Sequence, residues 1–199
     1  VAGNVPLNLT SVNALKICEL SGFFGVPVFR GSPAPLKRKL ITAEHVHGKT
    51  GLDGTDLSVK KKELEPTDAV DFIIECTEKY RDEKITICAL GPLTNVAKVL
   101  KKDSVLTESI EEIVLMGGGF FEGGNITPAA EFNIYVDPEA AKIVLESGLK
   151  ITMLPLDVTH KTLVQRNFLE KLRKSGKNSA IKAAKLLDFF ERYDVEKYG

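Results

Sequence analysis

The sequence has no excess of charge of either sign and no long apolar run. Its 199 residues contain 27 Lys and Arg against 27 Asp and Glu, so the formal net charge is zero. A protein that grips phosphate backbones needs a basic surface, so a nucleic-acid partner is not expected. No apolar stretch approaches the roughly 20 residues that cross a bilayer, and no basic segment precedes an apolar one at the start. We therefore expect a soluble, cytoplasmic protein with no membrane partner.

Cysteine is also scarce. Cys18, Cys76 and Cys88 have no short spacing of the kind that builds a zinc site, and their number is odd. Each lies among apolar neighbours, where a free thiol behaves as a small hydrophobic side chain. We predict three buried thiols without a reactive role.

Short β-branched runs alternate with stretches of helical period, which indicates parallel strands joined by crossover helices. The composition, 43% hydrophobic and 27% charged, is typical of one globular domain, here covering residues 1–199. We predict an α/β domain with a mostly parallel open sheet and flanking helices. Expected strands are 26–29, 85–90, 113–116 and 151–156, with 1–2 as the end of another. Expected helices are 10–21, 68–80, 94–102, 138–147, 164–174 and 179–193, with clear starts at Asp68 and at Asp137.

Two long connections, residues 31–66 and 117–137, leave from the C-terminal ends of expected strands, where open parallel sheets bind their ligands. The first contains His45 and His47, which suit acid, base, metal-binding or base-contacting roles. Solvent-exposed loop histidines are an equally good interpretation of this pair, because no third ligand lies nearby in the sequence.

The second connection is rich in glycine, but its glycines do not have the spacing of a dinucleotide-binding fingerprint. Phe120 and Phe121 lie among them. We expect one of these rings to pin the loop onto the core, although either ring could offer an aromatic face to a planar ligand.

Further along, Glu131 and Asn133 lie in an otherwise apolar segment. A buried carboxylate needs partners to offset its desolvation, and sugar hydroxyls are both donors and acceptors. If the segment is extended, Glu131 and Asn133 point the same way and Phe132 points the opposite way, whereas a tight turn would remove this relation. These side chains are candidates for a polyol site, although asparagines and glycines after strands also simply form turns.

Four motifs in this order and spacing resemble the inosine-uridine preferring nucleoside hydrolases. They are ALGPLTN at 89–95, VLMGGG at 114–119, AEFN at 130–133 and DPEAA at 137–141. The resemblance extends to VAGN at 1–4, HVHG at 45–48 and DVTH at 157–160, and so covers nearly the whole chain.

The resemblance implies hydrolysis of purine or pyrimidine ribonucleosides to free base and ribose, in nucleoside salvage, by a homo-oligomer. A bound calcium ion would hold the attacking water and the ribose diol. By position, His47 corresponds to a base-side contact, and Leu90 to the residue whose backbone carbonyl binds calcium. The ribose-binding positions of the family correspond to Asn4, Asn125, Glu131 and Asn133. The positions that line the sugar pocket correspond to Met116 and Phe132.

The sequence also departs from the family pattern. The family begins with an aspartate-rich segment that supplies calcium ligands and the general base, and it has a later His-Asp pair. Neither has a match here, so no catalytic residue is recognisable, and we expect a nucleoside hydrolase fold that is incomplete at both ends. The leading hypothesis is part of a working enzyme. The alternative is a shortened, non-catalytic homologue that binds a ligand or a partner, and base preference is not predicted.

Overall fold

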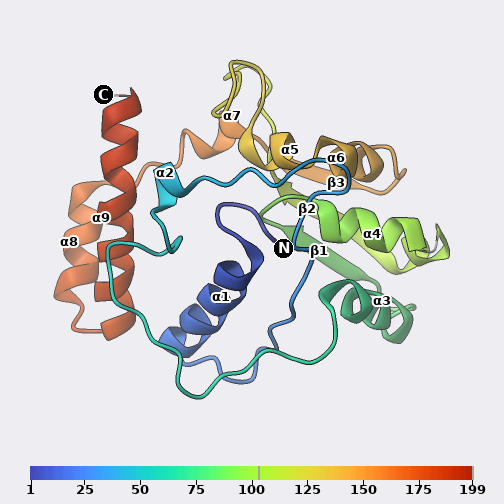
Figure 1. Cartoon of the computed structure of the whole chain (residues 1–199), viewed down its shortest axis with the longest axis horizontal. Coiled ribbons are helices and arrows are strands. Elements are labelled where there is room, and N and C mark those ends of the chain that lie inside the picture. Colours follow the sequence, from blue (N-terminus) through green and yellow to red (C-terminus); the bar gives the residue numbers. More distant parts are fainter. Residues whose placement is uncertain (103, 199) are drawn as a thin grey trace. The chain divides into compact units, whose positions relative to one another are not determined.

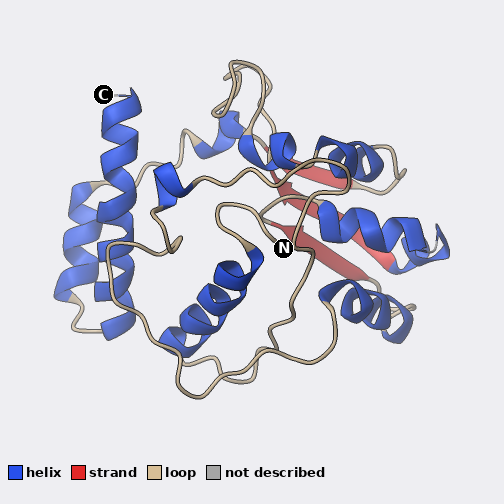
Figure 2. Cartoon of the chain, viewed as in Figure 1, coloured by secondary structure: helices blue, strands red, loops and turns tan. Residues whose placement is uncertain are grey.

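The computed structural model describes residues 1–102 and 104–198, and it confirms the α/β class with a parallel sheet (Figures 1 and 2). In chain order the elements are α1 (Leu7–Ser21), α2 (Glu44–His47), α3 (Ala69–Lys79), β1 (Ile85–Ala89), α4 (Thr94–Lys102), η1 (Ser104–Ser109), β2 (Ile110–Met116), α5 (Phe132–Val136), α6 (Pro138–Leu145), β3 (Ile151–Leu154), α7 (Leu156–Thr159), α8 (Arg166–Lys174) and α9 (Asn178–Tyr198).

The chain divides into two compact units, each built from three separate segments. The sheet unit comprises Val1–Gly3, Phe29–Ile41 and Pro66–Thr162, and the helical unit comprises Asn4–Val28, Thr42–Glu65 and Leu163–Gly199. The single domain expected over residues 1–199 stays a prediction.

The sheet unit has strand order β1-β2-β3, and both neighbouring pairs are parallel. Parallel neighbours need crossover connections, and α4 lies between β1 and β2 in the chain while α6 lies between β2 and β3. The core joins one face of β2 to α4 and α6 (Figure 2). Its buried apolar side chains are Leu93, Val96, Ala97, Ile110, Ile113, Leu115, Ala140, Ala141 and Val144.

The prediction of three buried thiols is not confirmed for any of the three residues and is plainly wrong for Cys88. Cys88 is exposed, because in β1 it points away from the core like Thr86 two residues before it. Cys18 and Cys76 are partly buried, and burial raises the pKa of the Cys76 thiol.

Both expected helix starts are confirmed. Asp68 caps α3, and Asp137 caps α6 by accepting a hydrogen bond from the Ala140 amide at 3.0 Å. Asp137 is fully buried, and its second oxygen accepts hydrogen bonds from the Leu36 amide at 2.9 Å and the Thr94 hydroxyl at 2.6 Å. One carboxylate therefore ties the 31–41 segment and α4 to the start of α6.

Several expected boundaries differ from the structure. Residues 26–29 do not form a strand, and Pro27 there has no amide proton to donate to a ladder. Residues 1–2 are not a strand either, although the Ala2 amide donates to the Ser32 carbonyl at 2.9 Å. β2 begins three residues earlier than expected, and β3 ends at Leu154 because Pro155 leads into α7.

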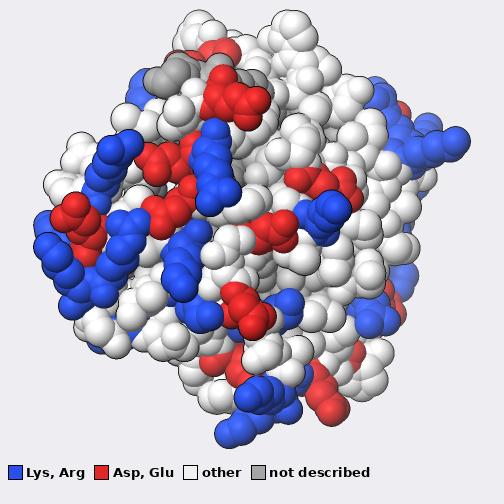
Figure 3. All heavy atoms as spheres, turned by 60° about the vertical axis from the view of Figure 1, so that its left-hand side comes forward, with Lys and Arg blue, Asp and Glu red and all other residues white. Residues whose placement is uncertain are grey.

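In the helical unit, α8 and α9 pack against each other, and one guanidinium nitrogen (Nη2) of Arg173 in α8 contacts both carboxylate oxygens of Asp188 in α9, at 2.5 and 2.6 Å. The Glu19 carboxylate of α1 accepts hydrogen bonds from three successive backbone amides, those of Lys60, Lys61 and Lys62. On the face of the molecule drawn in Figure 3, basic and acidic side chains are interspersed. No helix in the described part of the chain is long and apolar enough to cross a membrane.

Candidate functional site

The C-terminal ends of the three parallel strands lie at one edge of the sheet. Leu90 follows β1, Met116 ends β2, and Asp157 lies in α7 shortly after β3. Ligands of open parallel sheets bind at this edge. The residues from the connection between β2 and α6 therefore have the position of a binding site.

The Glu131 carboxylate is a buried charged group of this connection. Glu131 is 3% exposed and is the N-cap of α5. Its Oε2 atom accepts hydrogen bonds from the Ile134 amide at 3.2 Å and the Gly118 amide at 3.1 Å. These two backbone donors offset part of the desolvation of the carboxylate.

The other predicted sugar-site residues of the sheet unit form one connected cluster with Glu131. The Asn133 side-chain amide donates to the Met116 carbonyl at 3.1 Å and lies 3.3 Å from the Met116 sulfur. The Asn125 side-chain oxygen accepts a hydrogen bond from the Phe132 amide at 2.8 Å, and the Phe132 ring is buried. Five residues that the sequence singled out, spread over 18 positions from 116 to 133, thus lie together.

Of the two geometries left open for this segment, the extended one is not formed. Phe132–Val136 is a short helix, so Glu131 and Asn133 are not related by strand alternation. Both side chains have protein partners, but not at every polar atom. Within the described residues, Glu131 Oε1 and Asn133 Oδ1 receive no hydrogen bond. Two acceptor atoms on neighbouring side chains suit a ligand that carries several hydroxyl groups.

Asp157 is a residue of this edge to which the sequence assigned no role. Its two carboxylate oxygens accept hydrogen bonds from the Phe120 amide at 2.7 Å and the Phe121 amide at 2.8 Å. These backbone donors, Phe120 first, lower the pKa of the Asp157 carboxyl. Its place just after a strand was the available signal, but the sequence does not reveal which amides it meets.

The rings of Phe120 and Phe121 are 79% and 92% exposed. The expectation that one of them pins the loop onto the core is therefore wrong. The loop is fixed by hydrogen bonds to its backbone, and its two aromatic side chains extend into solvent.

Leu90 directly follows β1, and its side chain is 79% exposed. Residues 1–102 and 104–198 contain no group of three or more His, Cys, Asp or Glu side chains placed to hold a metal ion. Calcium takes about six to eight oxygen ligands, usually including carboxylates. The described residues therefore do not by themselves fit a calcium site at the Leu90 carbonyl.

Asn4 and His47 belong to the helical unit. The Asn4 side chain is exposed, and its carbonyl accepts a hydrogen bond from the Ala43 amide at 2.8 Å. His47 ends α2, and its ring stacks on Phe190 of α9 with 5.5 Å between centroids. Burial, and then the charge of His45, lower the pKa of His47. The solvent-exposed alternative holds for His45 but not for His47, which is half-buried.

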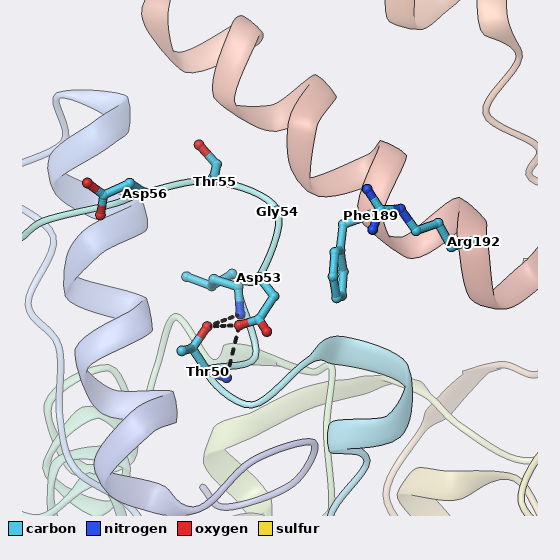
Figure 4. A pocket seen from close by; sticks show the side chains of 8 residues that line it. Thr50, Asp53, Gly54, Thr55, Asp56, Phe189 and Arg192 are labelled. Carbon is cyan, nitrogen blue, oxygen red and sulfur yellow. Dashed lines mark hydrogen bonds between the residues drawn. The ribbon is translucent and has the colours of Figure 1, made fainter.

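The segment after His47 borders a shallow, open pocket of about 560 Å³ in the helical unit (Figure 4). Asp53 accepts hydrogen bonds from the Thr50 hydroxyl and from the amides of Lys49 and Thr50, both at 3.1 Å. The Thr50 hydroxyl contributes most to lowering the pKa of this carboxyl. The pocket is lined by Thr50, Leu52, Asp53, Gly54, Thr55, Asp56, Phe189 and Arg192.

The whole chain, residues 1–199, matches the sequence profile of the inosine-uridine preferring nucleoside hydrolases. It is 47% identical over 199 residues to the pyrimidine-specific ribonucleoside hydrolase RihA of Photobacterium profundum. It is 44% identical over the same length to an uncharacterized protein of Schizosaccharomyces pombe. Each alignment covers 100% of this chain and 64% of the relative, so the chain spans about 64% of the length of these relatives.

Solved structures give the same result. A purine-preferring ribonucleoside hydrolase from Gardnerella vaginalis superimposes with a TM-score of 0.92 at 32% identity, over 98% of this chain and 63% of that one. A plant nucleoside hydrolase superimposes with a TM-score of 0.93 at 34% identity, over 100% of this chain and 63% of that one.

Proposed function

Because this chain belongs to the inosine-uridine preferring nucleoside hydrolase family, we propose that the protein hydrolyses the N-glycosidic bond of ribonucleosides to free base and ribose. Relatives with named activities are ribonucleoside hydrolases, one described as pyrimidine-specific and another as purine-preferring. The two named activities differ in the preferred base, whereas both act on ribonucleosides. The shared substrate part is therefore the ribose.

The observation that carries the proposal is the cluster around α5. A carboxylate that is 3% exposed lies two residues from an amide side chain, and each retains an acceptor atom. We propose that Glu131 Oε1 and Asn133 Oδ1 accept hydrogen bonds from ribose hydroxyls. In this proposal Met116 and Phe132 line the sugar pocket. Asn125, which lies earlier in the connection between β2 and α5, also binds the sugar.

Glu131 has a second role in the proposed reaction. Cleavage of an N-glycosidic bond develops positive charge on the sugar, as in an oxocarbenium ion. A buried carboxylate stabilises such charge more strongly than an exposed one, because the surrounding dielectric is low. Glu131 is therefore proposed to bind the ribose and to stabilise its transition state.

In the helical unit we propose Asn4 as a further ribose contact and His47 as a contact to the base. The neutral imidazole of His47, favoured by its burial, carries one donor and one acceptor and so matches the polar edge of a base. The stacked ring of Phe190 fixes the plane of the imidazole.

The family resemblance further implies calcium, nucleoside salvage, a cytoplasmic location and a homo-oligomer, and we retain these as proposals. The described residues offer the Leu90 carbonyl and no acidic cluster for calcium. No step of the reaction is therefore assigned to the ion here, and no general base or leaving-group acid is assigned to this chain.

The test is the release of ribose from inosine and from uridine by the full natural polypeptide, followed with a reducing-sugar assay. We expect steady release that requires a divalent cation. Binding of ribose without release of free base would contradict the proposal and support the alternative of a non-catalytic, ligand-binding homologue.

A further inference from the structure

The loop after β2, residues 117–121, is held in place without the usual apolar anchor. The Phe120 and Phe121 rings are 79% and 92% exposed, so neither buries the area that would fix the loop. A loop tip whose aromatic side chains do not pack should be mobile unless its backbone is bound.

Its backbone is bound by α7. The Asp157 carboxylate accepts one hydrogen bond on each oxygen, from the Phe120 amide at 2.7 Å and the Phe121 amide at 2.8 Å. One residue earlier in α7, the Leu156 amide donates to the Gly118 carbonyl at 2.9 Å. α7 therefore fixes the loop at three backbone groups. The two made by Asp157 are charge-assisted and are the shorter ones.

The same loop is connected directly to the α5 cluster. The Gly118 amide donates to Glu131 Oε2 at 3.1 Å, so the position of Gly118 orients this carboxylate. The two limbs of the loop also lie against each other, because a Cβ atom on Gly119 would come within 1.9 Å of the Gly123 carbonyl oxygen. We therefore expect a movement at Phe120 and Phe121 to reach Glu131 through Gly118, and Asn125 through Gly123.

We propose that Asp157 is a positioning residue for the ribose site. By holding the Phe120 and Phe121 amides it fixes the loop whose Gly118 amide orients the Glu131 carboxylate. This inference rests on the proposed function, since the ribose site is what Asp157 positions. Asp157 itself has both oxygens occupied by backbone amides and is not a catalytic residue.

The test compares Asp157→Asn with a matched control, Glu112→Gln, in the full natural polypeptide. Glu112 also accepts a side-chain hydrogen bond, from Thr152, and pairs with Lys150, but it lies near the start of β2, far along the strand from the loop. Asparagine keeps the size of the side chain but offers one acceptor oxygen for two amides. Asp157→Glu retains both oxygens and serves as the conservative variant.

In Asp157→Asn we expect hydrogen exchange at the Phe120 and Phe121 amides to become about tenfold faster, the ratio that corresponds to one lost charge-assisted hydrogen bond. The KM for inosine and for uridine should rise by the same factor, roughly fivefold or more, with a smaller change in kcat. Asp157→Glu should recover part of the KM, and Glu112→Gln should change neither quantity.

Faster exchange with unchanged KM would overturn the proposal, because the loop would then be ordered without serving the site. Unchanged exchange would overturn it too, since Asp157 would not be the anchor. Binding of D-ribose, followed by saturation-transfer NMR, separates this result from the fate of the proposed reaction. If the unsubstituted protein binds ribose but releases no ribose from nucleosides, the proposed reaction is contradicted. The role of Asp157 is then tested by whether Asp157→Asn weakens ribose binding.

Discussion

The loop after β2 and the loop after α2 are each fastened by one aspartate, but the rings beside them lie in opposite environments. Asp157 binds the amides of Phe120 and Phe121, whose rings are exposed. Asp53 binds the loop that follows His47, whose ring stacks on Phe190. At Phe120 and Phe121 the first loop is held by hydrogen bonds and not by its rings, whereas the second loop combines a carboxylate with aromatic packing.

The glycines of the two loops show the same contrast. A Cβ atom on Gly124 would lie 2.2 Å from the Thr127 carbonyl oxygen and 2.3 Å from the Ala130 amide nitrogen, which are both backbone atoms of the same loop. A Cβ atom on Gly54 would lie 2.6 Å from the Phe189 Cβ, on α9. The first loop is closely folded on itself, and the second packs against a helix. Removal of one anchor should therefore affect the two loops differently.

The largest effect is expected from Gly124→Ala. The new methyl group meets backbone that cannot move without unfolding the loop, so nucleoside hydrolysis should fall by about a hundredfold or more, in the range of severe backbone disruptions. The measurement is kcat/KM for inosine in the full natural polypeptide. Gly25→Ala is the matched control, because no atom lies within 4 Å of its Cβ and its φ is not positive. Equal activity of the two variants would show that the loop adapts.

A smaller and unequal effect is expected when each anchor is weakened in turn. Asp157→Asn should accelerate amide exchange at Phe120 and Phe121 more than Asp53→Asn accelerates it at Lys49 and Thr50. The reason is that aromatic packing still restrains the second loop. Exchange rates are measured by NMR on both variants. Equal acceleration in the two loops would remove the distinction between them.

His47→Ala should change substrate preference without a general loss of activity. Because His47 is proposed to meet the base, the ratio of kcat/KM for inosine to that for uridine should shift by about threefold to tenfold, the scale of one neutral hydrogen bond. Asn125→Ala is the comparison, since a sugar contact should lower both rates alike. A common factor for both substrates in His47→Ala would place this residue outside the base site.

Acidification should loosen the two loops at different pH values. Burial lowers the pKa of His47 in the folded protein, so its contribution to stability is full above about pH 6.5 and declines as the pH falls toward the folded pKa. The depressed pKa values of Asp53 and Asp157 mean that their contributions are present above about pH 3.9 and are lost only as the pH falls through the folded values. Exchange at Val46 and Gly48 should thus rise before exchange at Phe120. His47→Gln should remove the first step, and a simultaneous rise would contradict this order.

The smallest effect is expected from Phe121→Ser. A ring that is 92% exposed contributes little to folding, so the free energy of unfolding should change by less than about 0.5 kcal/mol. Phe190→Ser should cost about 2 kcal/mol or more, because that ring packs against His47. Chemical denaturation measures both. A large loss for Phe121→Ser would mean that the ring is buried in solution.

Local signals in the sequence predicted much of the fold. The caps Asp68 and Asp137 placed α3 and α6, and periodicity placed β1 and α4 almost to the residue. The strand expected at 26–29 is wrong because the prediction gave more weight to the β-branched residues than to the missing amide donor of Pro27. α5 was missed because five residues are too few to show a helical period, although the carboxylate of Glu131 can cap a helix.

The candidate site was predicted in part. The order of the motifs predicted a shared site for Met116, Asn125, Glu131 and Asn133. In the structure these four residues lie in one cluster. The role of Asp157 was not predictable, because its partners are backbone amides 36 and 37 residues away in the sequence. The sequence gives the identity of a side chain, but not which backbone groups reach it after folding.

The central claim is that the α5 cluster binds the ribose, which every ribonucleoside shares. The most direct measurement is kcat/KM for inosine and uridine with Glu131→Ala and Asn133→Ala in the full natural polypeptide. Asp68→Ala is the control, because it also removes a helix cap in the sheet unit but lies outside the cluster. Loss of a buried hydrogen bond to the sugar costs about 1.5 to 3 kcal/mol, so each variant should lose at least tenfold, by the same factor for both substrates. Near-normal kinetics in both variants, or a loss no larger than that of Asp68→Ala, would contradict the account.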